Sequence, residues 1–206
     1  MVNFALRHRS RSTLSPGYGL FQRLPLFLVF ALFSTSALPC AIAGSATSGP
    51  EAVLYLIGDG GLAESGSPVM GQLRDDLLSL SEKTPAVVAF LGDNIYPRGL
   101  RIEAPYYATD RGHLDAQIEV VRGSSALAIF VPGNHDWDDS GKNGRARLAA
   151  QEDYLAAQAI DGLETTLLRP QGGCPGPETM RLGEAALLVF LDTQWWLHPH
   201  ERSEEA

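Results

Sequence analysis

The chain has 206 residues, of which 45% are hydrophobic and 19% are charged, and its formal net charge is −8. This length fits one globular domain with an additional segment, and the acidity argues against nucleic acid or anionic lipid as the main partner. The negative net charge does not exclude phosphorylated substrates, because bound metal ions would dominate the electrostatic field near their site.

Residues 1–43 differ in composition from the rest of the chain. They contain four arginines and no Asp or Glu, followed by an apolar stretch over 24–38 and the sequence Ala41-Ile42-Ala43. This order is typical of a secretory signal peptide cleaved near Ala43, which predicts an exported protein, periplasmic or secreted, without a stable membrane span. An uncleaved N-terminal membrane anchor is the alternative, although the apolar run is short for a span. Residues 44–50 are small and polar, as in a linker.

The remaining domain, 51–206, alternates apolar runs with stretches of helical spacing and is expected to be α/β. In chain order the pattern predicts a strand over 52–57, a helix over 67–81, a strand over 87–91, a helix over 110–122, a strand over 126–131 and a helix over 145–160. Shorter strands are predicted over 165–168, 179–182 and 186–191. Strand–helix–strand units of this length imply parallel pairs with right-handed crossovers.

Each of the first three strands runs into a loop with polar side chains. The loops are Gly58-Asp59-Gly60-Gly61, Gly92-Asp93-Asn94-Ile95-Tyr96 and Gly133-Asn134-His135-Asp136. Because α/β folds place their chemistry at the carboxyl ends of the strands, we expect these side chains to meet at one edge of the sheet.

These residue types suit a centre of two metal ions. Asp93 is the candidate bridge, with Asp59 serving one metal and Asn134 the other. Tyr96 as a phenolate would favour trivalent iron at its site, with Zn, Mn or Fe at the other. Two metal ions about 3.5–4 Å apart can hold an activated hydroxide and clamp a phosphoryl group.

The two residues after Asn134 are candidates for a catalytic role. His135 could donate a hydrogen bond to the phosphoryl oxygens or a proton to the leaving group. Asp136 could orient His135, as carboxylates behind metal sites do. Each candidate also has a structural interpretation, because Gly-Asp after a strand is often only a turn and Tyr96 could be a packed aromatic residue.

Together the three loops resemble the first three of five motif blocks of the calcineurin-like metallophosphoesterases. The tyrosine of Gly-Asp-Asn-Ile-Tyr makes the chain most similar to the purple acid phosphatase branch. The resemblance covers about residues 52–196 and implies an αββα sandwich. It also implies a dinuclear metal centre that hydrolyses phosphoesters of a phosphorylated small molecule or related substrate.

The chain departs from this family after the third block. The last two blocks, Val-x-x-His and Gly-His-x-His, are absent, and His198-Pro199-His200 has only the spacing of the second. The resemblance therefore implies a domain that lacks the C-terminal part of the second sheet and the histidines that complete both metal sites. A non-catalytic or incomplete binding fragment of the same fold is the alternative function.

Overall fold

The computed structural model describes residues 2–4, 49–158 and 166–202. Most of the predicted signal segment, 1–43, and most of the predicted linker, 44–50, lie outside the described residues. Of that N-terminal segment, residues 2–4 form the short strand β1 (Val2–Phe4). Among the described residues, none of the helices has the length and apolar character that a membrane crossing requires.

A five-stranded sheet forms the centre of the domain, and its strand order follows the chain. Besides β1 it contains β2 (Val53–Ile57), β3 (Ala86–Leu91), β4 (Leu127–Val131) and β5 (Thr166–Leu168). Strands β2 to β5 are parallel, and β1 pairs antiparallel with β2 at the edge. The three predicted strands before residue 132 are therefore confirmed as a parallel set.

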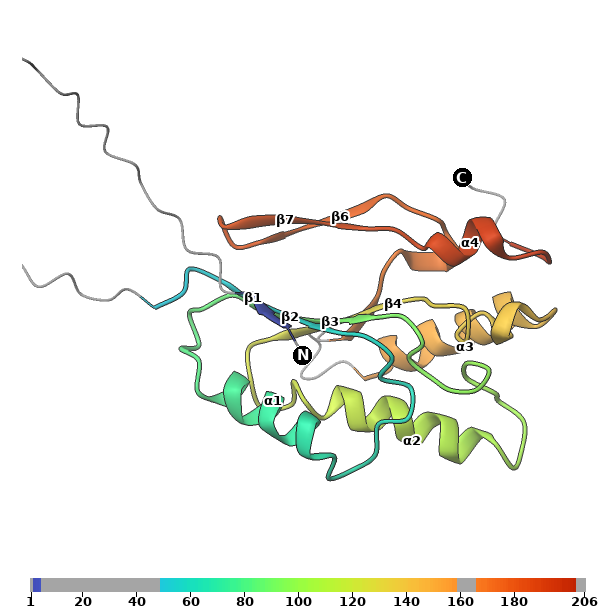
Figure 1. Cartoon of the computed structure of the whole chain (residues 1–206), viewed down its shortest axis with the longest axis horizontal. Coiled ribbons are helices and arrows are strands. Elements are labelled where there is room, and N and C mark those ends of the chain that lie inside the picture. Colours follow the sequence, from blue (N-terminus) through green and yellow to red (C-terminus); the bar gives the residue numbers. More distant parts are fainter. Residues whose placement is uncertain (1, 5–48, 159–165, 203–206) are drawn as a thin grey trace, which may run out of the picture. The chain divides into compact units, whose positions relative to one another are not determined.

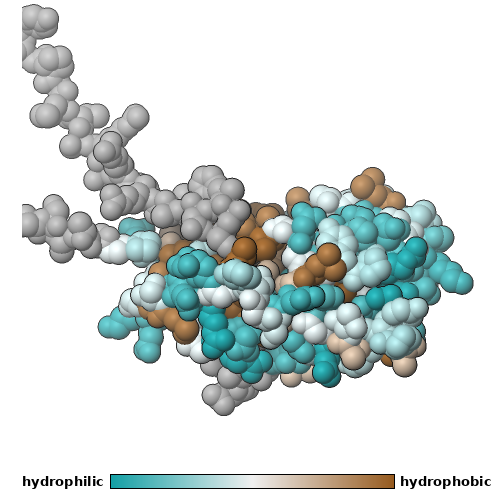
Figure 2. Space-filling view, turned by 60° about the horizontal axis from the view of Figure 1, so that its bottom comes forward, coloured by the Kyte–Doolittle hydropathy of each residue, from teal (hydrophilic) through white to brown (hydrophobic). Residues whose placement is uncertain are grey.

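Three helices cover one face of this sheet (Figure 1). They are α1 (Pro68–Leu78), α2 (Tyr107–Ile118) and α3 (Gly144–Ala156). Because consecutive parallel strands are neighbours throughout, right-handed crossovers place every helix on the same side. The main core forms there, where Leu73, Leu114 and Leu148 of the helices pack against strand residues such as Val88 and Phe130. Figure 2, which brings this helical side forward, shows a mostly hydrophilic outer surface with scattered hydrophobic residues.

A two-stranded antiparallel hairpin covers the opposite face of the sheet (Figure 1). It consists of β6 (Glu178–Leu182) and β7 (Ala186–Phe190), followed by the short helix α4 (Thr193–Leu197). Leu182 and Phe190 pack against Val87, Ala89 and Ile129 in a second apolar cluster. An apolar cavity of about 370 Å³ lies between β7 and the carboxyl ends of β2, β3 and β4.

The expected α/β class is confirmed, with helices, a mostly parallel sheet and an antiparallel hairpin as successive layers. Helix boundaries differ from the sequence pattern by a few residues. The helix predicted over 110–122 begins earlier, at Tyr107, and ends at Ile118. Among the described residues, the remaining short elements are two 3-10 turns, η1 (Asp138–Ser140) and η2 (Gln171–Gly173).

Candidate metal centre

The three polar loops leave the sheet at the same edge. In the parallel register, Ile57 pairs with Phe90, and Phe90 pairs with Phe130, so β2, β3 and β4 end side by side. The rings of Phe90 and Phe130 stack with their centroids 4.7 Å apart and are buried. This aromatic pair lies in the part of the sheet from which the polar loops extend.

Asp59, Asp93 and Tyr96 meet at this edge, as predicted. The Tyr96 hydroxyl donates to Asp59 Oδ1 at 2.8 Å and lies 3.1 Å from Asp93 Oδ2, so two carboxylates from different loops converge on one phenol. Burial and these hydrogen bonds from the protonated phenol raise the pKa of Tyr96. The phenol is therefore protonated at neutral pH, and a cation would have to lower its pKa before it could act as a phenolate ligand.

The backbone at both carboxylates has an unusual conformation. Asp59 has a φ of 55° and Asp93 a φ of 54°, in the left-handed region that non-glycine residues rarely adopt. The loops also approach too closely for side chains at two glycines. A Cβ on Gly61 would lie 2.5 Å from the Asp93 carbonyl oxygen, and one on Gly133 would lie 2.4 Å from both Asp93 N and Asp93 Oδ1. Strained and closely packed backbone of this kind is concentrated at functional sites.

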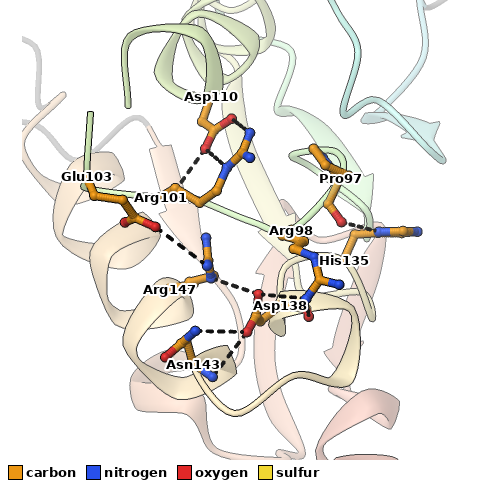
Figure 3. A network of polar contacts seen from close by, with 9 residues as sticks. All are labelled: Pro97, Arg98, Arg101, Glu103, Asp110, His135, Asp138, Asn143 and Arg147. Carbon is orange, nitrogen blue, oxygen red and sulfur yellow. Dashed lines mark hydrogen bonds and ion pairs between the residues drawn. The ribbon is translucent and has the colours of Figure 1, made fainter. Parts of the chain in front are cut away.

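His135 lies beside this group. Its backbone N–H donates to Asp93 Oδ1 at 3.2 Å, and its ring packs edge-on against Tyr96 with centroids 4.4 Å apart. Nδ1 lies 2.7 Å from the Pro97 carbonyl oxygen (Figure 3). Because a carbonyl oxygen only accepts hydrogen bonds, Nδ1 carries the proton and Nε2 is the nitrogen left for other partners.

Asn134 is half-buried, and its side chain contacts the turn that follows the loop. Its amide Nδ2 donates to Asp139 Oδ1 at 3.2 Å. With the amide nitrogen engaged there, the carbonyl oxygen Oδ1 is the free end of the side chain. That oxygen is the atom that could contact a metal ion.

Asp136 does not contact the His135 ring and points into the interior. The carboxylate is buried and accepts hydrogen bonds from Gly133 N at 2.8 Å and from Asn94 N and Nδ2 at 3.1 and 3.2 Å. Burial, with a smaller contribution from the charge of Asp93, raises the pKa of Asp136 to about 7, while the backbone donors oppose the shift. The expected orienting contact is thus replaced by one that ties the β3 and β4 loops together.

Two further residues that the sequence pattern did not single out support the loops. Gln117 of α2 is buried and donates to the Asn94 carbonyl oxygen at 2.8 Å. Asn94 itself is buried and also donates to the Val131 carbonyl oxygen at 2.8 Å. In the sequence, Asn94 is recognisable only as an amide residue within the Gly-Asp-Asn loop. Gln117 is recognisable only as a polar residue on the apolar side of a helix.

The donors suit a hard cation. The two carboxylates, the phenol and the Asn134 carbonyl are all oxygen ligands, and the Tyr96 proton occupies a position between two carboxylates where positive charge is favourable. Within the ranges that the structure describes, no group of three or more His, Cys, Asp or Glu side chains converges.

The histidines near the C-terminus lie in a different environment. His198 is buried against Trp137, with ring centroids 4.7 Å apart, and against Gly144. Trp137 in turn donates from Nε1 to the buried Asp192 at 2.8 Å, and burial raises the pKa of Asp192 to about 6. The Leu191-Asp192-Thr193 strand end thus begins α4 and anchors a buried tryptophan.

No protein-family model matches the chain, and comparisons with curated proteins and with solved structures found no significant match.

Proposed function

We propose that this chain belongs to a metal-dependent phosphoester hydrolase, in which water cleaves a P–O ester bond to give an alcohol and phosphate. The observation that supports it most strongly is the convergence of Asp59, Asp93 and Tyr96 from two strand ends on one point. The layer order of helices, parallel sheet and antiparallel hairpin is compatible with part of the αββα sandwich that the motif resemblance implies.

The oxygen atoms that would hold a cation are those of Asp59, Asp93, Tyr96 and the Asn134 carbonyl. A metal ion bound there would supply Lewis acidity toward the phosphoryl oxygens and activate water. The left-handed backbone at Asp59 and Asp93 and the close approach at Gly133 hold these donors in place before any ligand arrives. As a phenolate, Tyr96 would favour iron at its own site, with Zn, Mn or Fe at a second site.

His135 would act on the substrate through Nε2. Pro97 holds the Nδ1–H, so neutral His135 offers an acceptor at Nε2, whereas the imidazolium form offers a donor. In the imidazolium form Nε2 can give a proton to the leaving-group oxygen. Asp136 contributes indirectly, because its carboxylate fixes the two loops that carry Asp93 and His135.

A second candidate is a non-catalytic or incomplete fragment of the same fold that binds a metal or a phosphorylated ligand without turnover. It rests on the sequence, in which the Val-x-x-His and Gly-His-x-His blocks that complete the metal sites of the resembled family do not occur. This candidate predicts weak or single-ion binding and no hydrolysis by the chain itself.

Metal counting and hydrolysis of p-nitrophenyl phosphate by the 206-residue chain with iron, zinc or manganese separate the two candidates. Hydrolysis that is lost in Asp93→Ala supports the enzyme; one bound ion without hydrolysis supports the fragment, and no bound metal contradicts the enzyme.

The variant His135→Asn tests the histidine, because Asn Nδ2 can still donate to the Pro97 carbonyl but lacks an equivalent of Nε2. His113→Asn is its matched control, since His113 Nδ1 makes the same type of contact, 2.8 Å from the Ala63 carbonyl oxygen. We expect loss of turnover with retained metal binding only in His135→Asn.

A further inference from the structure

The turn after the third loop contains three consecutive non-glycine residues with left-handed backbone. Asp138, Asp139 and Ser140 have φ angles of 60°, 51° and 62°. Left-handed conformation is disfavoured for L-residues, and Asp is among the few that adopt it singly rather than in runs. A run of three requires other contacts that hold the turn in this shape.

Those contacts come mainly from Asp138, whose carboxylate is buried. Asn143 donates to it from the backbone N at 3.2 Å and from Nδ2 at 3.3 Å, and Arg147 Nε lies 3.0 Å from it. Arg98 reaches the same residue from the neighbouring loop, with NH1 3.5 Å from the carboxylate (Figure 3). Gln194 of α4 adds a hydrogen bond of 2.8 Å to the Ser140 hydroxyl. The conformation is thus imposed from two other elements and a loop.

The residue in the middle of the run, Asp139, contacts Asn134 of the third polar loop. The carboxylate of Asp139 is exposed and makes one described contact, the 3.2 Å hydrogen bond that it accepts from Asn134 Nδ2. A carboxylate at neutral pH has acceptors only, so it can bind the NH₂ end of the Asn134 amide and not its oxygen end. Asp139 therefore fixes the Asn134 amide in the orientation in which Nδ2 points toward Asp139 and the carbonyl oxygen points away from it.

We propose that Asp139 is a positioning residue, held in strained backbone so that its carboxylate fixes the Asn134 amide with Oδ1 available to the metal ion. This inference rests on the proposed function, because it assigns Asn134 Oδ1 as a ligand. Partners that orient metal ligands commonly change metal affinity 10- to 100-fold when they are removed.

The substitution Asp139→Gly separates this role from a contribution to folding. Glycine adopts a φ of 51° without strain, so the urea midpoint of Asp139→Gly is expected to be unchanged or higher than that of the wild type. The same variant is expected to bind Mn²⁺ about 10-fold or more weakly in calorimetric titrations of the full chain. A residue that only stabilised the turn would not show a higher or equal midpoint together with weaker metal binding.

A double-mutant cycle tests whether the effect passes through Asn134. In Asn134→Ala the amide is already absent, so adding Asp139→Gly should leave the Mn²⁺ affinity of that variant unchanged. Asp139→Asn serves as the charge control, because it tolerates left-handed backbone and keeps a carbonyl acceptor while losing the negative charge. We expect a smaller loss of affinity in Asp139→Asn than in Asp139→Gly.

Three results would overturn the inference alone. Equal losses in Asp139→Asn and Asp139→Gly would mean that Asp139 acts by its charge alone, and additive losses with Asn134→Ala would mean that it acts on another group. If Asp139→Gly bound Mn²⁺ with wild-type affinity, Asp139 would have no positioning role, and the proposed function would stand. Failure of the wild-type chain to bind Mn²⁺ at all would instead remove the proposed function, and the inference with it.

Discussion

The close approach of the β3 and β4 loops makes Gly133→Ala a specific test of the site. A Cβ at Gly133 would lie 2.4 Å from the backbone N of Asp93 and 2.4 Å from its Oδ1, closer than real Cβ atoms approach other groups. The first of these atoms is backbone and cannot rotate away. The two loops must therefore separate, and the Asp93 carboxylate must move from its place beside Tyr96.

The expected destabilisation follows from the contacts that this separation disturbs. Inserting a methyl group into closely packed structure costs about 1–3 kcal/mol. The separation also strains the hydrogen bond from Gly133 N to Asp136 and the one from His135 N to Asp93, each of which contributes about 1 kcal/mol. We expect Gly133→Ala to lower the free energy of unfolding by about 2–4 kcal/mol and to weaken Mn²⁺ binding.

Gly58→Ala is the matched control at the same edge of the sheet. A Cβ there would meet no atom within 4 Å, and the residue does not have left-handed backbone. Its main effect acts on the unfolded chain, so it should be neutral or stabilise the protein by about 0.4–1 kcal/mol. Urea denaturation followed by tryptophan fluorescence compares the two variants. Equal unfolding free energies and equal Mn²⁺ affinities would refute the proposed loop contact.

Three further predictions concern the domain that supports the site. Burial raises the pKa of Asp192 from 3.8 to about 6, so the folded protein binds this proton more tightly than the unfolded chain and loses stability as pH rises from about 4 to 6. Asp192→Asn should remove up to about 3 kcal/mol of this pH dependence in urea titrations; an unchanged slope would contradict the assignment. Asp110→Ala should cost about 3–5 kcal/mol, because it leaves the Arg101 guanidinium, 14% exposed and 2.7 Å from Asp110, without its partner. The exposed Asp153→Ala on α3 is the control, and similar losses in both would argue against the buried pair. Phe130→Ala should lower the free energy of unfolding by about 3–5 kcal/mol, since it empties the buried stack with Phe90; a loss below about 1 kcal/mol in denaturation would show that the stack is not part of the core.

The parallel core of the fold could be predicted because its strands are short apolar runs that end in glycine. The runs before Asp59, Asp93 and Asn134 contribute apolar residues to the clusters on both faces of the sheet, which gives a clear pattern in the sequence. The sequence did not predict the sheet to which residues 166–168 belong. A run as short as Thr166-Leu167-Leu168 carries no information about its partner strand, and the pairing with β4 becomes visible only in the structure.

The site could be predicted in its donors but not in their orientation. The sequence motifs predicted that Asp59, Asp93 and Tyr96 lie at one edge of the sheet, because the direction of the strands fixes the edge at which the following loops lie. The Asp136 carboxylate points into the interior because three N–H groups there donate hydrogen bonds to it. No local sequence pattern shows that these donors are present. The left-handed backbone of residues 138–140 could not be predicted from the sequence either. Asp occurs readily in ordinary turns, and only distant contacts impose this conformation.

The central claim is that oxygen atoms of Asp59 and Asp93 contact the same cation. Anomalous diffraction from crystals of the chain grown with Mn²⁺ tests it directly. We expect a manganese peak bound by both carboxylates, with the Tyr96 and Asn134 oxygens beside it. Manganese found only at other carboxylates of the chain, or the two aspartate side chains turned away from each other, would contradict it.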